Sequence, residues 1–442
     1  MAVTPERRRR ILGIALPIIG AMTSQNILNL VDTAMVGALG AAALAGVGMA
    51  SFLHFMAVGG ITGLSSAVQA MAARRQGEGR VDESAVPLNG GLLIALTIGL
   101  PLGVLLCMAS PAIMSLLVDD PTVVEEGAPY MALRMLAIWA VGMNFSFRGF
   151  WNGTDRSRLY LYTLLVMHVA NVLLNYVLIF GKLGFPAMGT SGAALGTVIA
   201  TLLGTTIYFV LAWREARPNG FMARMPGRAQ MGSLMKLGIP ASIQQFMFAA
   251  GFTALFWIIA QVGTAEMAVA NVLINITLVA VLPAIGLGLA AATLVGQALG
   301  RADPVDAHAW AWDVVKVAAL IFIALGLPML LAPQWVLSAF LHTDELRQLG
   351  QLPLQMVGAG IVLDGTGLIL MQALLGAGAA GLVMRIGIGM QWLLFLPIAY
   401  VLGPVAGFGL LAIWGAFMGY RFLQAALFCW YWERRGWTGI QV

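Results

Sequence analysis

Asp32 is a lone carboxylate in the apolar stretch NLVDTAMVGALG, residues 29–40. A charged side chain inside a membrane costs about 2.5 kcal/mol or more, so such residues are rare and usually functional. An acid in this position could take up a proton or a cation. At about 1.5 Å per residue, Asp32 lies roughly 30 Å beyond Ile11, where the apolar run starts, so a place at the outer interface is the alternative.

A second group of polar residues occurs in the apolar segment VMHVANVLLNYVLIFG. His168, Asn171 and Asn175 are three and four residues apart, so they share one helix face. Asparagine side chains both donate and accept hydrogen bonds, which suits a protonatable acid, and their oxygens suit a hard cation such as Na⁺. The alternative is that these side chains only bridge packed helices.

Membrane helices must hold these residues, because the chain is 60% hydrophobic and only 10% charged. Soluble domains are roughly one quarter charged, and apolar runs of about 20 residues mark membrane-spanning helices. We therefore expect an all-α integral membrane protein, with loops too short for a soluble catalytic domain. The twelve predicted spans are 11–35, 43–70, 88–109, 128–149, 159–181, 191–213, 233–260, 267–297, 311–332, 348–374, 383–402 and 407–431.

Arginine residues collect in alternate loops, beginning with Arg7–Arg10 before the first span and ending with Arg434 and Arg435 after the last. Loops rich in Arg and Lys tend to stay in the cytoplasm, which predicts that both termini are cytoplasmic. The net charge of +5 is spread over these loops. Because the charge is not gathered on one face, we expect no nucleic-acid partner.

The second half of the chain repeats the first. The single shift that places Pro17 on Pro240 aligns further glycines and alanines without a gap. Parallel repeats of six helices are a transporter plan, with the substrate site between the lobes. We expect two pseudo-symmetric lobes, residues 1–213 and 233–442, joined by a cytoplasmic linker at 214–232. Pro17 lies within the first span and could bend that helix.

The duplication also shows where the two halves differ. Asp32 falls on Leu255, and Asp364, in the sequence IVLDGTG, falls on Val141. Each predicted lobe therefore keeps one embedded acid at a position of its own, which makes Asp364 a second candidate. No phosphate-binding GxxxxGK sequence occurs, so we expect no cofactor, and transport driven by an ion gradient or by a partner ATPase.

Four segments, taken in order, resemble the multidrug and toxic compound extrusion (MATE) transporters. They are VDTAMVG at 31–37, FRG at 147–149, NVLLNYVLIFG at 171–181 and GTSGAALGT at 189–197. The resemblance covers essentially the whole chain and implies a V-shaped pair of six-helix lobes in the bacterial inner membrane. Such a protein is not an enzyme but exports small amphipathic, often cationic compounds in exchange for H⁺ or Na⁺. We expect it to be monomeric, with membrane lipid as its surroundings.

The resemblance also implies which residues couple transport to the ion. Asp32 matches the family's acid on a bent first helix. Further polar positions match on the fourth, fifth, sixth and tenth helices: Asn144, Asn171, Asn175, Thr197 and Asp364. A bound Na⁺ would be held by Asp32, Asn171, Asn175 and Thr197. Two departures leave the ion open, because some relatives have aspartate in place of Asn175, and other branches have an acid on the seventh helix that span 233–260 lacks.

Three other functions remain open from the sequence. A lipid-linked-oligosaccharide flippase of the same wider superfamily often has extra spans and a cavity rich in Arg or Lys, whereas buried bases are scarce here. A multispan membrane enzyme acting on lipid would need clustered acids, histidines or metal ligands at a membrane face, and the four histidines are scattered. A passive channel is not excluded by the duplication or by lone acids.

Overall fold

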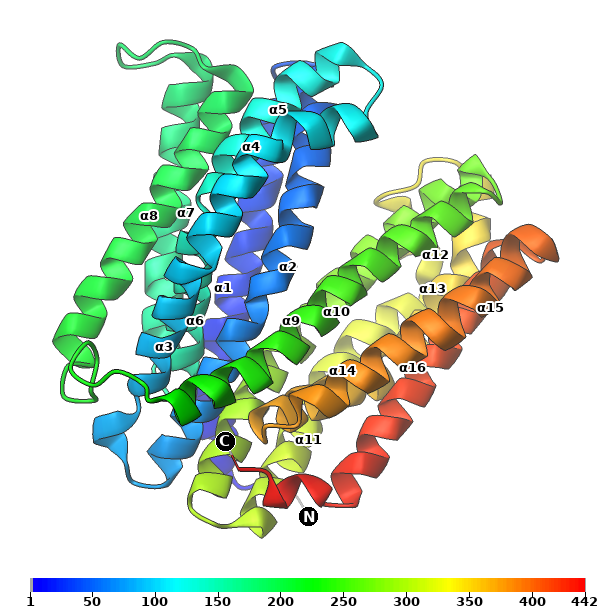
Figure 1. Cartoon of the computed structure of the whole chain (residues 1–442). Coiled ribbons are helices and arrows are strands. Elements are labelled where there is room, and N and C mark those ends of the chain that lie inside the picture. The colour runs from blue at the N-terminus through cyan, green and yellow to red at the C-terminus, as the bar shows by residue number, and fades with distance from the viewer. Residues whose placement is uncertain (1–2, 442) are drawn as a thin grey trace. The chain divides into compact units, whose positions relative to one another are not determined.

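The structure, a computed structural model, describes residues 3–441, which form helices and no strands (Figure 1). Two long helices, α1 (Pro5–Gly37) and α9 (Arg228–Ala260), are each divided between two compact units. The amino-terminal unit runs from Gly20 to Ser242, and the carboxy-terminal unit combines the segment ending at Ile19 with the segment beginning at Ile243. The shift that places Pro17 on Pro240 also places Ile19, where the division falls in α1, on Ser242, where it falls in α9.

Besides its parts of α1 and α9, the amino-terminal unit contains the helices from α2 to α8. In it α2 packs against α5 and α6, and α8 packs against α5 and α7. Its helices are α2 (Ala41–Gly77), η1 (Val81–Glu83), α3 (Val86–Thr97), α4 (Gly99–Leu117), α5 (Pro121–Leu136), α6 (Ile138–Gly153), α7 (Ser157–Phe180) and α8 (Gly189–Glu215).

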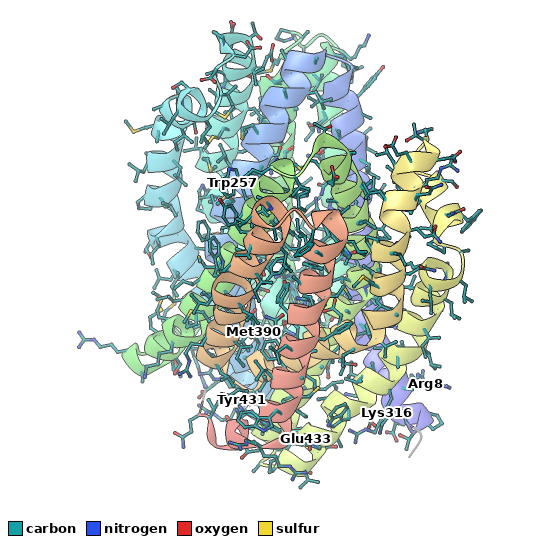
Figure 2. The ribbon with its side chains drawn as sticks, turned by 90° about the vertical axis from the view of Figure 1, so that its right-hand side faces the viewer. Arg8, Trp257, Lys316, Met390, Tyr431 and Glu433 are labelled. Carbon is teal, nitrogen blue, oxygen red and sulfur yellow. The ribbon has the colours of Figure 1, made fainter. Side chains whose placement is uncertain are left out.

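The carboxy-terminal unit is built around α13, which packs against α10, α11 and α16. Its helices are α10 (Thr264–Gly300), α11 (Pro304–Leu331), α12 (Pro333–Ser338), α13 (Asp344–Gly376), α14 (Ala380–Ile388), η2 (Gly389–Phe395), α15 (Leu396–Tyr400), η3 (Val401–Val405), α16 (Gly409–Glu433) and η4 (Gly436–Gly439). Within this unit, Figure 2 shows the charged residues Arg8, Lys316 and Glu433 at the same end, whereas Trp257 lies toward the other end.

Eleven of the twelve predicted spans are confirmed. Among the described residues, eleven helical segments are long and apolar enough to cross a membrane, and each coincides with a predicted span. The remaining span, predicted at 128–149, is a pair of helices, α5 and α6, that meet at Ala137 with a bend of 50°. The predicted lobes of 1–213 and 233–442 and the linker at 214–232 stay a prediction. Here α8 ends at Glu215 and α9 begins at Arg228.

Several helix starts follow directly from local sequence. Asp120 caps α5 by accepting a hydrogen bond from the backbone N–H of Thr122 over 2.9 Å, and Pro121 supplies a preset φ at the first helical position. The Thr122 hydroxyl also donates to Asp120, and these bonds lower the pKa of the exposed Asp120 carboxyl. Asp303 caps α11 in the same way, followed by Pro304.

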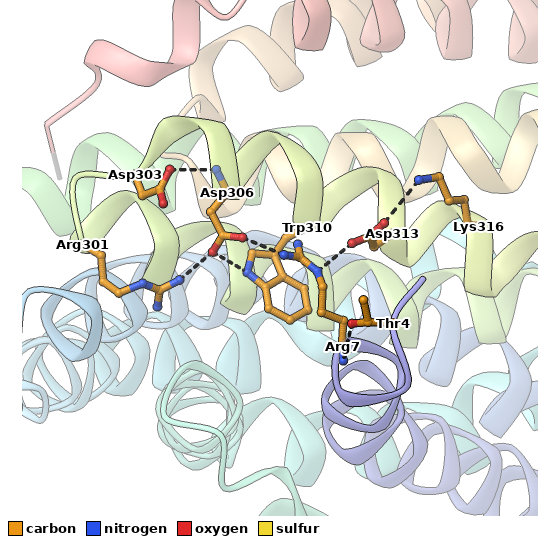
Figure 3. Close-up of polar contacts among 8 residues, drawn as sticks. All are labelled: Thr4, Arg7, Arg301, Asp303, Asp306, Trp310, Asp313 and Lys316. Carbon is orange, nitrogen blue, oxygen red and sulfur yellow. Dashed lines mark hydrogen bonds and ion pairs between the residues drawn. The ribbon is translucent and has the colours of Figure 1, made fainter. Parts of the chain in front are cut away.

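Arg7, in the first turn of α1, binds three side chains of α11 within the carboxy-terminal unit (Figure 3). Its guanidinium lies 2.7 Å from Asp306 Oδ1 and 2.6 Å from Asp313 Oδ2, and it stacks 3.7 Å from the centre of the Trp310 ring. Trp310 Nε1 donates to Asp306 over 2.8 Å, which closes the group. The start of α1 is therefore attached to α11 by charge and by a cation–π contact.

Replacing Arg7 with Ala should lower the stability of the carboxy-terminal unit. Ion pairs of this partial burial and one cation–π contact together contribute about 1–3 kcal/mol. We expect a lower thermal midpoint for the purified protein in detergent. The control is Arg8→Ala, because Arg8 is exposed, and equal midpoints for the two variants would contradict the role given to Arg7.

Candidate functional site

Four of the residues selected from the sequence lie together in the amino-terminal unit, on three helices. Asp32 is on α1, five residues before that helix ends at Gly37 (37 − 32 = 5). Asn171 and Asn175 are one turn apart on α7, and Thr197 is in the third turn of α8. The two asparagines lie on one face of α7, as their spacing predicts, and this face is directed toward α1 and α8.

A continuous chain of hydrogen bonds joins these four side chains. Asn175 Nδ2 donates to Asp32 Oδ1 over 2.9 Å and to Asn171 Oδ1 over 3.0 Å. Asn171 Nδ2 donates to Thr197 Oγ1 over 3.0 Å, and the Thr197 hydroxyl donates to the backbone oxygen of Ala193 over 2.9 Å. Asn175 thus directs an amide N–H group toward the carboxylate, while Asn171 and Thr197 hold Asn175 from the other side.

Close packing of α8 on α7 fixes the asparagines in place. Asn171 is 2% exposed and Asn175 is 1% exposed. Gly196 makes this packing possible, because a Cβ at that position would overlap Asn175 Oδ1 and lie 3.2 Å from the Asn175 backbone nitrogen. That Oδ1 atom is buried and accepts no hydrogen bond from the described residues.

Asp32 has a neutral partner and no ion pair with any residue that the structure describes. Arg134 of α5 attracts the Asp32 carboxylate without forming an ion pair with it, and Arg134 Nη1 donates a hydrogen bond to the Tyr130 hydroxyl over 2.7 Å. A half-buried carboxylate with only an amide partner can accept a proton or cation without first breaking a salt bridge. Arg134 was not among the residues selected from the sequence. Its position inside the predicted span 128–149 was a signal that could have identified it.

The oxygen atoms near Asp32 decide which cation the site suits. Within residues 3–441 no three His, Cys, Asp or Glu side chains gather as a metal site. The group that Asn175 turns toward Asp32 is its NH₂, and Asn171 donates away to Thr197. N–H groups cannot ligate Na⁺, which needs several oxygen atoms, whereas a proton needs only the Asp32 carboxylate.

His168 and Asn144 lie outside this chain of hydrogen bonds. His168 is on the same face of α7, but its Nδ1 is 2.7 Å from Ser24 Oγ and its Nε2 is 3.1 Å from Gln25 Oε1, two turns before Asp32 on α1. Asn144 on α6 donates to the backbone oxygen of Thr201 over 3.3 Å and accepts from Thr205 over 2.9 Å. Both side chains connect helices of the same unit rather than contacting Asp32.

Asp364 belongs to the carboxy-terminal unit and has a partner that sequence reasoning missed. Arg421 of α16 binds Asp364 Oδ1 through Nε at 2.7 Å and Nη2 at 2.6 Å. The sequence does hold a signal for this partner, because Arg421 is a single arginine in the middle of the predicted span 407–431. Pro17 lies inside α1, two residues before the point at which that helix passes from one unit to the other.

Comparison with known proteins gives consistent matches along the chain. The model of a protein family described as MatE matches residues 17–177 and 240–401, and the two matches start at the residues that the internal duplication aligns. A probable multidrug resistance protein NorM of Rhizobium meliloti is 28% identical over 432 residues, which cover 94% of this chain and 90% of the relative. The probable NorM of Thermotoga maritima is 25% identical over 93% of this chain and 89% of its own length.

Solved structures share the fold. A multidrug resistance MATE family transporter of the MOP superfamily in an outward-facing conformation matches with a TM-score of 0.88 and 19% identity, covering 98% of this chain and 97% of that one. A MOP superfamily transporter from Pyrococcus furiosus, whose binding pocket is described as having reverse polarity, matches with the same TM-score, identity and coverage.

Proposed function

Because this chain belongs to the MatE family, a family of membrane transporters rather than enzymes, we propose that it exports small amphipathic, often cationic compounds in exchange for protons. It is a multi-pass membrane protein. The multidrug resistance named for its relatives supports this substrate class. We place it in the bacterial inner membrane as a monomer surrounded by lipid, with both termini in the cytoplasm.

The observation that carries the coupling proposal is the hydrogen bond from Asn175 to Asp32. When Asp32 is ionised, its carboxylate accepts a charge-assisted hydrogen bond from the Asn175 amide N–H. When Asp32 takes up a proton, the bond loses its charged acceptor and weakens from about 1.5–3 to about 1 kcal/mol. The two protonation states therefore differ in how firmly α1 is attached to α7.

Alternating access follows from this difference in the proposed cycle. A proton from outside neutralises Asp32, α1 loosens from α7 and bends near Pro17, and the substrate is expelled. Release of the proton to the cytoplasm restores the Asn175 bond and prepares the next cycle. A ligand can shift such a conformational equilibrium only by its differential affinity for the two states, and the charge-dependent bond at Asp32 supplies that difference.

A gradient-jump assay tests the proposal. Cells expressing the protein are loaded with ethidium, and either an inward proton gradient or an inward Na⁺ gradient is imposed. We expect the proton gradient to drive dye out and the Na⁺ gradient to have no effect. Export driven by Na⁺ would replace the proton with Na⁺ in the proposal, and dye that only equilibrates under both gradients would indicate a passive channel.

A further inference from the structure

The carboxy-terminal unit contains a buried ion pair between α13 and α16. The guanidinium of Arg421 directs Nε and Nη2 to the same oxygen of Asp364, at 2.7 and 2.6 Å, and each residue is 9% exposed. Arg421 Nη1 donates to Gln424 Oε1 over 3.2 Å. All three guanidinium nitrogens of Arg421 therefore have acceptors within the unit.

Both charges are far from the ends of their helices. Arg421 is twelve residues from Gly409 and twelve from Glu433 (421 − 409 and 433 − 421), and Asp364 is twelve residues before Gly376 (376 − 364). At about 1.5 Å per residue, each is roughly 18 Å from a helix end, near the middle of a membrane span. A charge at this depth is expensive unless it is paired, so the pair is a functional candidate by its position.

Aromatic packing keeps the arginine where it is. Tyr420, the preceding residue, stacks on Phe395 with 4.5 Å between ring centres and meets Phe417 edge-on at 5.5 Å. Both phenylalanines and Tyr420 are buried. This arrangement restricts the turn of α16 that carries Arg421, so little further ordering is needed to hold its side chain on Asp364.

We infer that Arg421 is a built-in counter-cation that withdraws Asp364 from cation exchange, so that coupling rests on Asp32 alone. The inference builds on the proposed function. An exchanging carboxylate must alternate between a bare and a neutralised state, as Asp32 can with its neutral Asn175 partner. Arginine does not deprotonate in proteins and cannot diffuse away. If a second cation bound Asp364, the Arg421 guanidinium would be left unpaired in an apolar interior. Breaking a buried ion pair in this way is strongly destabilising.

Infrared difference spectra of the purified full chain, taken between acidic and neutral pH, test this directly. A protonated carboxyl group has its own stretching band, so comparing the difference spectrum of a variant with that of the wild type shows whether the replaced acid titrates, whether or not the protein transports. Relative to the wild type, we expect Asp32→Asn to lose a band and the paired variant Asp364→Asn/Arg421→Gln to lose none. Arg421→Gln alone should add a band to the wild-type spectrum, and the paired variant should lack that band.

Loss of a wild-type band in the paired variant would overturn the inference, because Asp364 would then titrate despite Arg421. So would a folded Arg421→Gln protein with no new band. The matched control is Arg148→Gln, since Arg148 donates to the Ser65 hydroxyl over 3.0 Å rather than to a carboxylate, and it should add no band. Failure of the proposed function is seen separately, as absence of gradient-driven export in the wild type.

Proteoliposomes give a second readout of the same inference. The number of protons exchanged per ethidium is obtained from the proton gradient that balances a known dye gradient. We expect the same ratio in the wild type and the paired variant, and one additional proton per dye in Arg421→Gln. A lower ratio in the paired variant would show that Asp364 carries a coupling proton.

Discussion

Replacing Asp32 with Asn should abolish proton-driven export and leave the fold intact. Asparagine has nearly the shape of aspartate, and its Oδ1 can still accept the hydrogen bond that Asn175 donates over 2.9 Å. Only the charge and the ability to bind a proton are lost. We expect dye export from inverted vesicles under an imposed pH gradient to fall to the level of vesicles without the protein.

The fold can be checked independently of export in the Asp32→Asn protein. Removing a charge from an apolar helix relieves a desolvation cost, so its thermal midpoint should equal or exceed that of the wild type. The control is Asp119→Asn, which removes an exposed carboxylate before α5 and should leave export unchanged. Export at the wild-type rate in Asp32→Asn would contradict the proposal that Asp32 binds the driving proton.

The helices of this protein could be predicted because each carries a run of apolar residues long enough to span a membrane. The duplication indicated their grouping, since the shift that aligns Pro17 with Pro240 also relates the starts of the two family matches. The bend between α5 and α6 had no such signal. No proline or glycine lies within RMLAIWA, residues 134–140, where the two helices meet at Ala137.

The candidate site shows a similar division between local and tertiary information. Helical periodicity places Asn171 and Asn175 on one face, but it cannot say which helix that face meets. Thr197 and Asp32 are joined to the asparagines only because α8 packs on α7 and α1 is hydrogen-bonded to α7 in the same unit. His168 shares the predicted face, yet its partners come from an earlier turn of α1.

Asp364 shows the same limit in the other unit, because a buried acid alone does not reveal its counter-charge. Its partner Arg421 lies 57 positions later in the sequence, on α16. From sequence, one acid and one base in separate spans are two isolated charges, whereas in the folded unit they form one neutral pair. Asp32 therefore has a neutral amide partner, whereas Asp364 is paired with a charged one.

Gly196→Ala should disrupt the site without touching any of its polar side chains. The added Cβ would overlap Asn175 Oδ1, so the amide must move away from α8. The bond contributes about 1.5–3 kcal/mol when Asp32 is ionised and about 1 kcal/mol when Asp32 is protonated, so its loss would change the equilibrium between these two states by about 2- to 30-fold. We expect proton-driven export to fall by a similar factor.

Gly204→Ala is the matched control because it lies on the same helix and faces the same neighbour. A Cβ at Gly204 would overlap the side chain of Met167 on α7. The thioether of methionine has three rotatable bonds and can move aside, whereas Asn175 is held by bonds to Asp32 and Asn171. The two glycine variants should therefore have different export rates, with Gly204→Ala close to the wild type. Equal export by both would mean that the geometry at Asn175 does not control proton binding at Asp32.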